Sequence, residues 1–136
     1  NGLGNIYLML KNFNQAMRNF RNSLQLEQSN ENLLGVAINL NNIGLVYMNL
    51  EELDKALEYF MLSIQVNREI GSKRGIAICY NDIGDVFLLK KDIDKALNYY
   101  LQSLQLNIFI NEEFNLAINN FRVADMYILK NEYLTY

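Results

Sequence analysis

Hydrophobic residues recur along the chain at steps of three and four, and polar residues fill most of the positions between them. One such stripe, in the middle of the sequence, consists of Ala37, Leu40, Ile43, Gly44 and Tyr47. After a short polar break, the next stripe consists of Ala56, Leu57, Phe60, Ser63 and Ile64. Steps of three and four are typical of an α-helix, whereas a half-buried strand would alternate at every second position. The chain contains no proline, so nothing in it prevents long helices.

The stripes repeat with a period of 40 residues and need no insertion. Small residues recur in three columns, which are Gly4, Gly44 and Gly84, then Ala16, Ala56 and Ala96, then Ser23, Ser63 and Ser103. A fixed period in this range is typical of an array in which each unit buries its apolar face by stacking on its neighbours. The sequence therefore predicts a single array of repeats over residues 1–40, 41–80 and 81–120, with a partial repeat at 121–136.

Each repeat is predicted to contain two antiparallel helices. The first helices are expected at residues 1–10, 31–49, 72–90 and 112–130, and the second helices at 13–29, 53–69 and 93–110. Asp92 and Ser72 are candidate N-caps, because their side chains can accept hydrogen bonds from amides at a helix start. Gly71 can take the left-handed conformation that ends many helices, and Asn111 is expected to end a helix one unit later.

The recurring glycines predict a close approach of two helices. Glycine inside a helix costs about 1 kcal/mol relative to alanine, so its recurrence needs a compensating contact. We expect the aromatic residue three positions later, Tyr47 or Phe87, to pack over each crossing. Ala56 and Ala96 would supply the matching small surface on the second helix.

These columns resemble the tetratricopeptide repeat (TPR). The pattern is carried by Leu3-Gly4, Tyr7, Ala16, Phe20 and Ser23 in the first repeat, and by Ile43-Gly44, Tyr47, Ala56, Phe60 and Ser63 in the second. The usual repeat of that family has about 34 residues, and the longer form seen here is similar to repeats in kinesin light chains, regulators of spindle orientation, peptide-sensing regulators and sensor kinases. The resemblance implies an all-α fold, a right-handed α-solenoid of antiparallel helix pairs with about three and a half repeats. It also implies a concave groove, lined by the first helices, that binds proteins or peptides.

Composition narrows the possible functions. The chain is 51% hydrophobic and 20% charged, with a net charge of −3, and its cations are scattered, which argues against nucleic acid as a partner. No run approaches the roughly 18 apolar residues of a membrane span. A single cysteine, Cys79, is expected to be buried and suits a reducing, cytoplasmic location. The first residues, Asn-Gly-Leu-Gly, stand inside a predicted helix, so we expect the chain to be part of a longer protein.

The sequence contains no recognisable pattern of catalytic residues. Histidine, the commonest general base, is absent from the chain. Glycine loops that cradle phosphate and cysteine spacings that bind metal are also missing. We therefore expect a non-enzymatic protein without a cofactor or a metal.

The side of each first helix that lies outside the packing stripe is expected to face the groove. Its residues are Asn1, Asn5 and Leu8, then Ile38, Asn41, Leu45 and Met48, then Ile78, Asn81, Asp85 and Leu88, then Ile118, Phe121, Asp125 and Ile128. A column of asparagines could donate to and accept from a peptide backbone, and the alternative is that these side chains are only solvated. Asp85 and Asp125 favour a ligand with a basic residue, against the alternative of a solvated polar face.

Two functions are consistent with these patterns. The first is a scaffold that binds a peptide or partner segment in the groove. The alternative is a regulatory, sensor or dimerisation array within a larger signalling protein, attached to a kinase, a cyclase or a transcription regulator. We also expect self-association through the C-terminal helix, where Val123, Tyr127 and Ile128 lack a following helix.

Overall fold

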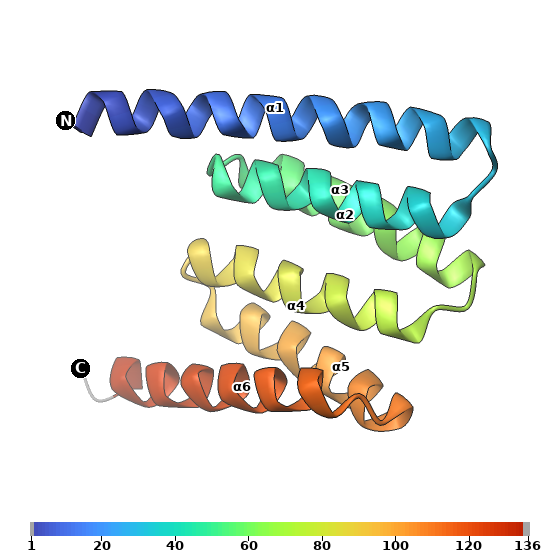
Figure 1. The fold of residues 1–136 in the computed structure, drawn as a ribbon. Helices are drawn as coiled ribbons and strands as arrows, with labels where there is room; N and C mark the ends of the chain where they lie inside the picture. Colours follow the sequence, from blue (N-terminus) through green and yellow to red (C-terminus); the bar gives the residue numbers. More distant parts are fainter. Residues whose placement is uncertain (1, 135–136) are drawn as a thin grey trace. The chain divides into compact units, whose positions relative to one another are not determined.

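The structure, a computed structural model, describes the backbone of residues 2–134 and the side chains of residues 9–132. Every element in this part of the chain is a helix, which confirms the all-α prediction (Figure 1). The six helices are α1 (Gly2–Ser29), α2 (Leu33–Asn49), α3 (Leu53–Glu69), α4 (Lys73–Leu89), α5 (Ile93–Ile110) and α6 (Glu113–Leu134).

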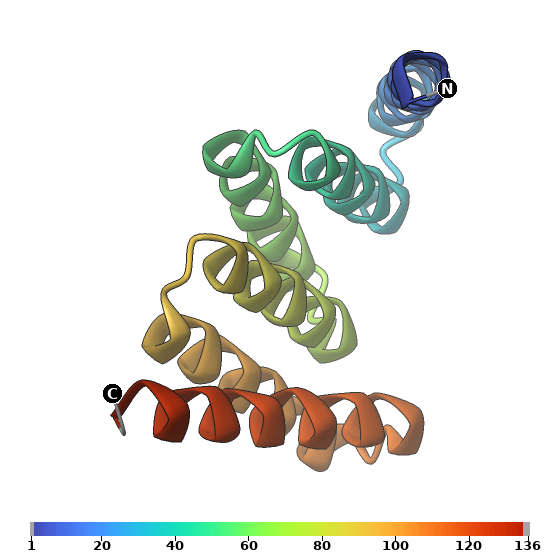
Figure 2. The same ribbon diagram turned by 90° about the vertical axis from the view of Figure 1, so that its left-hand side faces the viewer.

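The chain divides into two compact units, Asn1–Val66 and Asn67–Tyr136. The first unit contains α1, α2 and most of α3, and the second contains the end of α3 with α4, α5 and α6. In the second unit, α5 lies next to both α4 and α6 (Figure 2). The single continuous array expected from the sequence stays a prediction.

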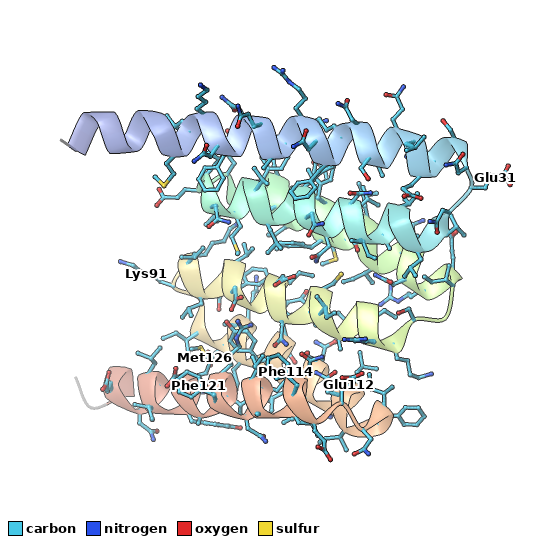
Figure 3. The ribbon with its side chains drawn as sticks, in the orientation of Figure 1. Glu31, Lys91, Glu112, Phe114, Phe121 and Met126 are labelled. Carbon is cyan, nitrogen blue, oxygen red and sulfur yellow. The ribbon has the colours of Figure 1, made fainter. Side chains whose placement is uncertain are left out.

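Five turns between helices share one backbone conformation. Each contains one residue with positive φ, and these residues are 20 positions apart: Glu31, Glu51, Gly71, Lys91 and Asn111. In each turn the amide of that residue donates to the carbonyl three positions earlier, and the next amide donates to the carbonyl five positions before itself. This is the Schellman pattern, which pairs carbonyls that a helix end leaves unsatisfied. Figure 3 labels two of these residues, Glu31 between α1 and α2 and Lys91 between α4 and α5. The predicted roles of Gly71 and Asn111 are thus confirmed.

Three helices begin with a side-chain cap. Asn32, Ser72 and Asp92 accept hydrogen bonds from the amides of Gly35, Gly75 and Lys95, at 3.3, 3.1 and 3.2 Å. Each bond satisfies one of the amides that have no partner within the helix. The predicted caps at Ser72 and Asp92 are confirmed.

The predicted break near residue 11 is wrong, because α1 runs as one helix of 28 residues (Figure 1). Lys11 aligns with Glu51 and Lys91, yet it lies within the helix. Residues 9–13 include neither glycine nor proline. A left-handed residue other than glycine costs roughly 1–2 kcal/mol, which packing of the two flanking helices on each other must offset. The first repeat therefore lacks the helix pair that the sequence predicted.

The glycines on α2 and α4 lie directly against aromatic rings. A Cβ atom added at Gly44 would lie 2.6 Å from a ring carbon of Phe60, and one at Gly84 would overlap the ring of Tyr100. Close helix approach is confirmed, but the ring comes from the second helix of the pair. Tyr47 and Phe87 were expected there and lie beside the crossing instead. Successive side chains on a helix point in different directions, and three positions on, the side chain is turned away from the glycine by about 60°.

The aromatic residues beside each crossing pack on rings of the second helix. Tyr47 packs against Tyr59 with ring centroids 5.4 Å apart, and Phe87 stacks on Tyr99 at 5.5 Å. Behind them Ala56 and Ala96 are fully buried, which confirms that they provide the small surface of the pair.

Each complete pair also contains a hydrogen bond from the serine column. Ser63 Oγ donates to the Ala37 carbonyl at 2.7 Å, and Ser103 Oγ donates to the Ala77 carbonyl at 2.7 Å. Serine therefore recurs in this column because its hydroxyl makes this hydrogen bond as well as because its side chain is small.

Candidate functional site

A groove of about 590 Å³ lies in the second unit between α4 and α6. It is lined by Asp85 and Leu88 of α4, Tyr100 of α5, and Ala117, Ile118, Phe121, Arg122, Asp125 and Met126 of α6. Figure 3 labels Phe121 and Met126 on α6. Five of the residues predicted to face the groove thus line it together, namely Asp85, Leu88, Ile118, Phe121 and Asp125.

The floor of the groove is a three-residue polar cluster. The Tyr100 hydroxyl donates to Asp85 Oδ1 at 2.6 Å, and Arg122 Nη1 lies 3.2 Å from Asp85 Oδ2. The guanidinium carbon of Arg122 also lies 5.7 Å from the centre of the Tyr100 ring, within the range of a cation–π contact. Because both oxygens of Asp85 have partners, this residue does not supply the free negative charge that the sequence suggested.

Burial sets the protonation of this cluster. Burial raises the pKa of the Asp85 carboxyl above 3.8, while the Tyr100 hydrogen bond and the charge of Arg122 act in the opposite direction. Burial also raises the pKa of the Tyr100 phenol, and the neighbouring carboxylate raises it further. Tyr100 therefore stays protonated at neutral pH and keeps donating to Asp85.

The free carboxylate of the groove is that of Asp125. It is half-buried, and among residues 9–132 it has no ion pair or hydrogen bond. One helical turn before it lies Phe121, whose side chain is 69% exposed although it lines the groove. The groove therefore offers an apolar ring and an unpaired negative charge on one face of α6.

Asn81 is not on the open face, which corrects the expectation from sequence. It is only 9% exposed, and its Oδ1 accepts a hydrogen bond of 2.8 Å from Asn119 Nδ2. Asn119 in turn accepts from Asn107 Nδ2, so three amides form a buried chain between α4, α5 and α6. Buried amides need such partners, because leaving one unpaired costs free energy. Asn81 therefore holds α4 and α6 together beside the groove.

Residues that the sequence analysis missed hold this site together. The sequence patterns did not point to Tyr100, Arg122 or Asn119 as site residues. A signal was available for Asn119, because a second asparagine, Asn39, stands in the same column and is also buried.

Four of the predicted site residues of the first unit lie on α2. Ile38 is exposed, while Asn41, Leu45 and Met48 are half-buried. The predictions at Asn1, Asn5 and Leu8 fall outside the described residues, since the structure gives no side chains there.

Residues 2–134 hold no helix that is both long and apolar enough to cross a lipid bilayer. No group of three or more Asp, Glu, His or Cys side chains among the described residues could hold a metal ion. Cys79 is buried, as predicted.

Comparison with known proteins agrees with this architecture. The model of the tetratricopeptide repeat family matches residues 35–107. Among solved structures, the crystal structure of BtubC (BKLC) from P. vanneervenii is similar, with a TM-score of 0.79 and 18% identity. The match covers 94% of this chain and 53% of that one, so the chain spans about half the length of its structural neighbour. No curated protein matches the sequence.

The matched residues include the glycine crossings, the serine hydrogen bonds and the turns at residues 51, 71 and 91. Tetratricopeptide repeats are in general non-enzymatic scaffolds that bind other proteins, and this chain has such a scaffold. The chain belongs to the tetratricopeptide repeat family.

Proposed function

We propose that the second unit binds a peptide segment of a protein partner in the groove between α4 and α6. The observation that carries this proposal is the pairing of exposed Phe121 with unpaired Asp125 in one groove. An exposed aromatic ring inside a depression is a typical anchor of a protein interface, because burying it contributes most of the binding free energy.

The groove favours a particular ligand chemistry. Phe121, Ile118 and Leu88 form an apolar surface that suits an aliphatic or aromatic side chain. Asp125 suits a lysine or arginine close to that side chain, and the charge pair should act mainly on orientation and association rate. Arg122 is engaged by Asp85, so it does not attract an acidic ligand strongly.

In the first unit, the corresponding surface is the α2 face that carries Ile38, Asn41, Leu45 and Met48. We retain these residues, and Asn1, Asn5 and Leu8, as proposed contacts of a longer ligand. Asn81 supports the groove rather than touching the ligand. We also propose a cytoplasmic protein without nucleic acid or membrane partners, which the scattered cations and the buried cysteine support.

Peptide selection tests this function. Peptides from a random display library are selected on the full chain, and their affinities are measured for the variants F121A, D125N and F114A. Phe114 is a matched control, because it is equally exposed on α6 but does not line the groove. F121A should weaken binding by about tenfold or more, D125N should weaken peptides that contain a basic residue, and F114A should have no effect. Equal losses for F121A and F114A would contradict the proposal.

A second candidate function is self-association within a regulatory array. Tyr127 and Ile128 of α6 are exposed and apolar, whereas Val123 packs against the α5 core. In a larger signalling protein such a face could dimerise an attached kinase, cyclase or transcription regulator. Light scattering on the full chain over a range of concentrations tests it, and a monomer at the highest concentration would exclude it.

A further inference from the structure

A second pocket of the second unit is lined by two cations and by no carboxylate of the described residues. It has a volume of about 590 Å³ and lies between the end of α3, α4 and α5. Its charged lining consists of Arg68 and Lys73, and its aromatic lining of Tyr80 and Phe109. Each of the three helices is preceded and followed by another helix of the chain, so the pocket does not lie at either end of the helix series.

The protein itself does not neutralise the two cations. Arg68 Nη2 donates a hydrogen bond of 3.2 Å to the uncharged Tyr80 hydroxyl, and the guanidinium has several further N–H donors. Lys73 Nζ lies 5.1 Å from the centre of the Phe109 ring, which is a cation–π contact. Among the described side chains, neither cation is in an ion pair, whereas the adjacent Arg74 is paired with Glu112. Both Arg68 and Lys73 can therefore donate to an anionic ligand.

The pocket residues are not part of the repeat pattern that packs the helices. The other repeats have different residues in the same columns, which are Gln28 and Ile108 for Arg68, Leu33 and Glu113 for Lys73, Leu40 and Asn120 for Tyr80, and Ser29 and Glu69 for Phe109. Lys73 is also the first residue of α4, where the helix dipole disfavours a positive charge. Helix packing and helix stability thus do not explain the presence of these side chains.

The rest of the pocket suits a peptide. The Phe109 side chain is 74% exposed although it lines the pocket, and Ile76 and Leu106 add partly buried apolar surface next to it. The side-chain amides of Gln102 and Gln105 can each donate to and accept from a peptide backbone. The pocket therefore combines an apolar surface, amide groups and positive charge.

We propose that this pocket binds an acidic segment of a protein partner, in which an aspartate or glutamate stands next to an apolar residue. The ligand carboxylate accepts charge-assisted hydrogen bonds from Arg68 and Lys73, and the apolar side chain packs on Phe109. Two unpaired cations on a chain with a net charge of −3 do not form the extended basic face that nucleic acid or an anionic membrane requires. The site is separate from the groove that contains Asp125, which suits a basic residue, and it does not depend on that groove.

Peptide selection on the F121A variant of the full chain tests this site. The substitution weakens the proposed groove, so a random display library should enrich peptides that contain Asp or Glu beside an apolar residue. Their affinities are then measured by fluorescence anisotropy. R68Q and K73Q should each weaken binding by about three- to tenfold, and F109A by about tenfold. Changing the acidic residue of the peptide to its amide should cause a similar loss without any change to the protein.

Lys91 provides the matched control for the two cations. It is exposed, has no ion pair among the described side chains and does not line the pocket, so K91Q should leave the affinity unchanged. Equal losses for R68Q, K73Q and K91Q would overturn the proposal, because they would indicate general charge attraction. Circular dichroism checks that each variant is folded.

Other selection results would also overturn the proposal. One is a set of enriched peptides without an acidic residue. Another is binding of a random-sequence oligonucleotide or a phosphatidylserine vesicle in place of acidic peptides, with release by R68Q, which would assign the pocket to phosphate groups. Because the acidic peptides are selected with the groove weakened, this proposal and the proposed function can fail separately.

Discussion

The hydroxyl of Tyr100 donates a hydrogen bond of 2.6 Å to Asp85, and the ring of the same tyrosine covers Gly84. One side chain thus fixes the distance between α4 and α5 and also supplies the floor of the groove. Arg122 of α6 binds the other oxygen of Asp85, so α4, α5 and α6 meet at this carboxylate. The repeat packing and the candidate site therefore share their central residues.

Removing the Tyr100 hydroxyl should destabilise the protein. In Y100F the ring still covers Gly84, but Asp85 Oδ1 loses its donor in a half-buried position. The expected loss is about 1 kcal/mol in the free energy of unfolding. Y99F is the matched control, because in the described structure Tyr99 makes ring contacts only. Urea unfolding measures both variants, and equal effects would show that the Asp85 bond contributes nothing.

The charge of Asp85 should make stability depend on pH. Burial raises the pKa of this carboxyl above 3.8 in the folded state, so the unfolded chain loses the proton first as pH rises. The contribution of Asp85 to the free energy of unfolding therefore falls as pH rises from 3.8 to the raised value, and stays low above it. Asparagine at this position does not titrate. We expect the stability of D85N relative to the native chain to increase between about pH 3 and pH 7. Urea titrations at several pH values check this, and a constant or opposite difference would contradict it.

Substitution in the glycine column should change stability more at Gly84, where an aromatic ring covers the position, than at Ala124, which is exposed. In G84A the new methyl group overlaps the Tyr100 ring, so we expect a loss of about 1–3 kcal/mol in spite of the better helix propensity of alanine. Ala124 occupies the same column on α6 and is exposed. Under conditions where the chain is monomeric, A124G should cost only about 1 kcal/mol, which is the propensity difference. Thermal unfolding compares the two, and a G84A variant as stable as the native chain would refute the close crossing.

Substituting glycine at two equivalent positions, Lys91 and Lys11, tests whether α1 continues as a helix through residue 11. Lys91 has a φ of 62°, so K91G should stabilise the protein by about 0.5–1 kcal/mol. Lys11 stands 80 positions earlier in the same column but lies inside α1, so K11G should destabilise it by about 1 kcal/mol. Unfolding in urea gives both values. Stabilisation by K11G would mean that residue 11 forms a turn, as the sequence pattern had predicted.

Features that depend on local chemistry could be predicted from the sequence. Ser72 and Asp92 cap helices through bonds to amides three positions later, and Gly71 takes its left-handed conformation within a single turn. The glycine crossings could also be predicted, because a costly residue recurred at a fixed period. Near Lys11 the local sequence allowed either a turn or a helix, and the sequence pattern favoured the wrong one.

The candidate site was harder to predict, because it depends on residues far apart in the chain. Asp85 and Arg122 were both visible in the sequence, but only the approach of α6 to α4 pairs them. The same approach buries Asn81 against Asn119, while Asp125 has no partner among the side chains that the structure describes. Helical periodicity shows on which side of its own helix a residue lies. It does not show which side chain of a neighbouring helix covers that residue.

The most direct test of the account is an amide chemical-shift titration of the full chain with a selected peptide that contains a basic residue. If the groove between α4 and α6 is the site, the largest shifts should occur at residues around Asp85, Leu88, Phe121 and Asp125. In F121A, the same shifts should need a peptide concentration about tenfold higher or more. Shifts concentrated instead at the other pocket of this unit, around Tyr80, Leu106 and Phe109, would contradict it.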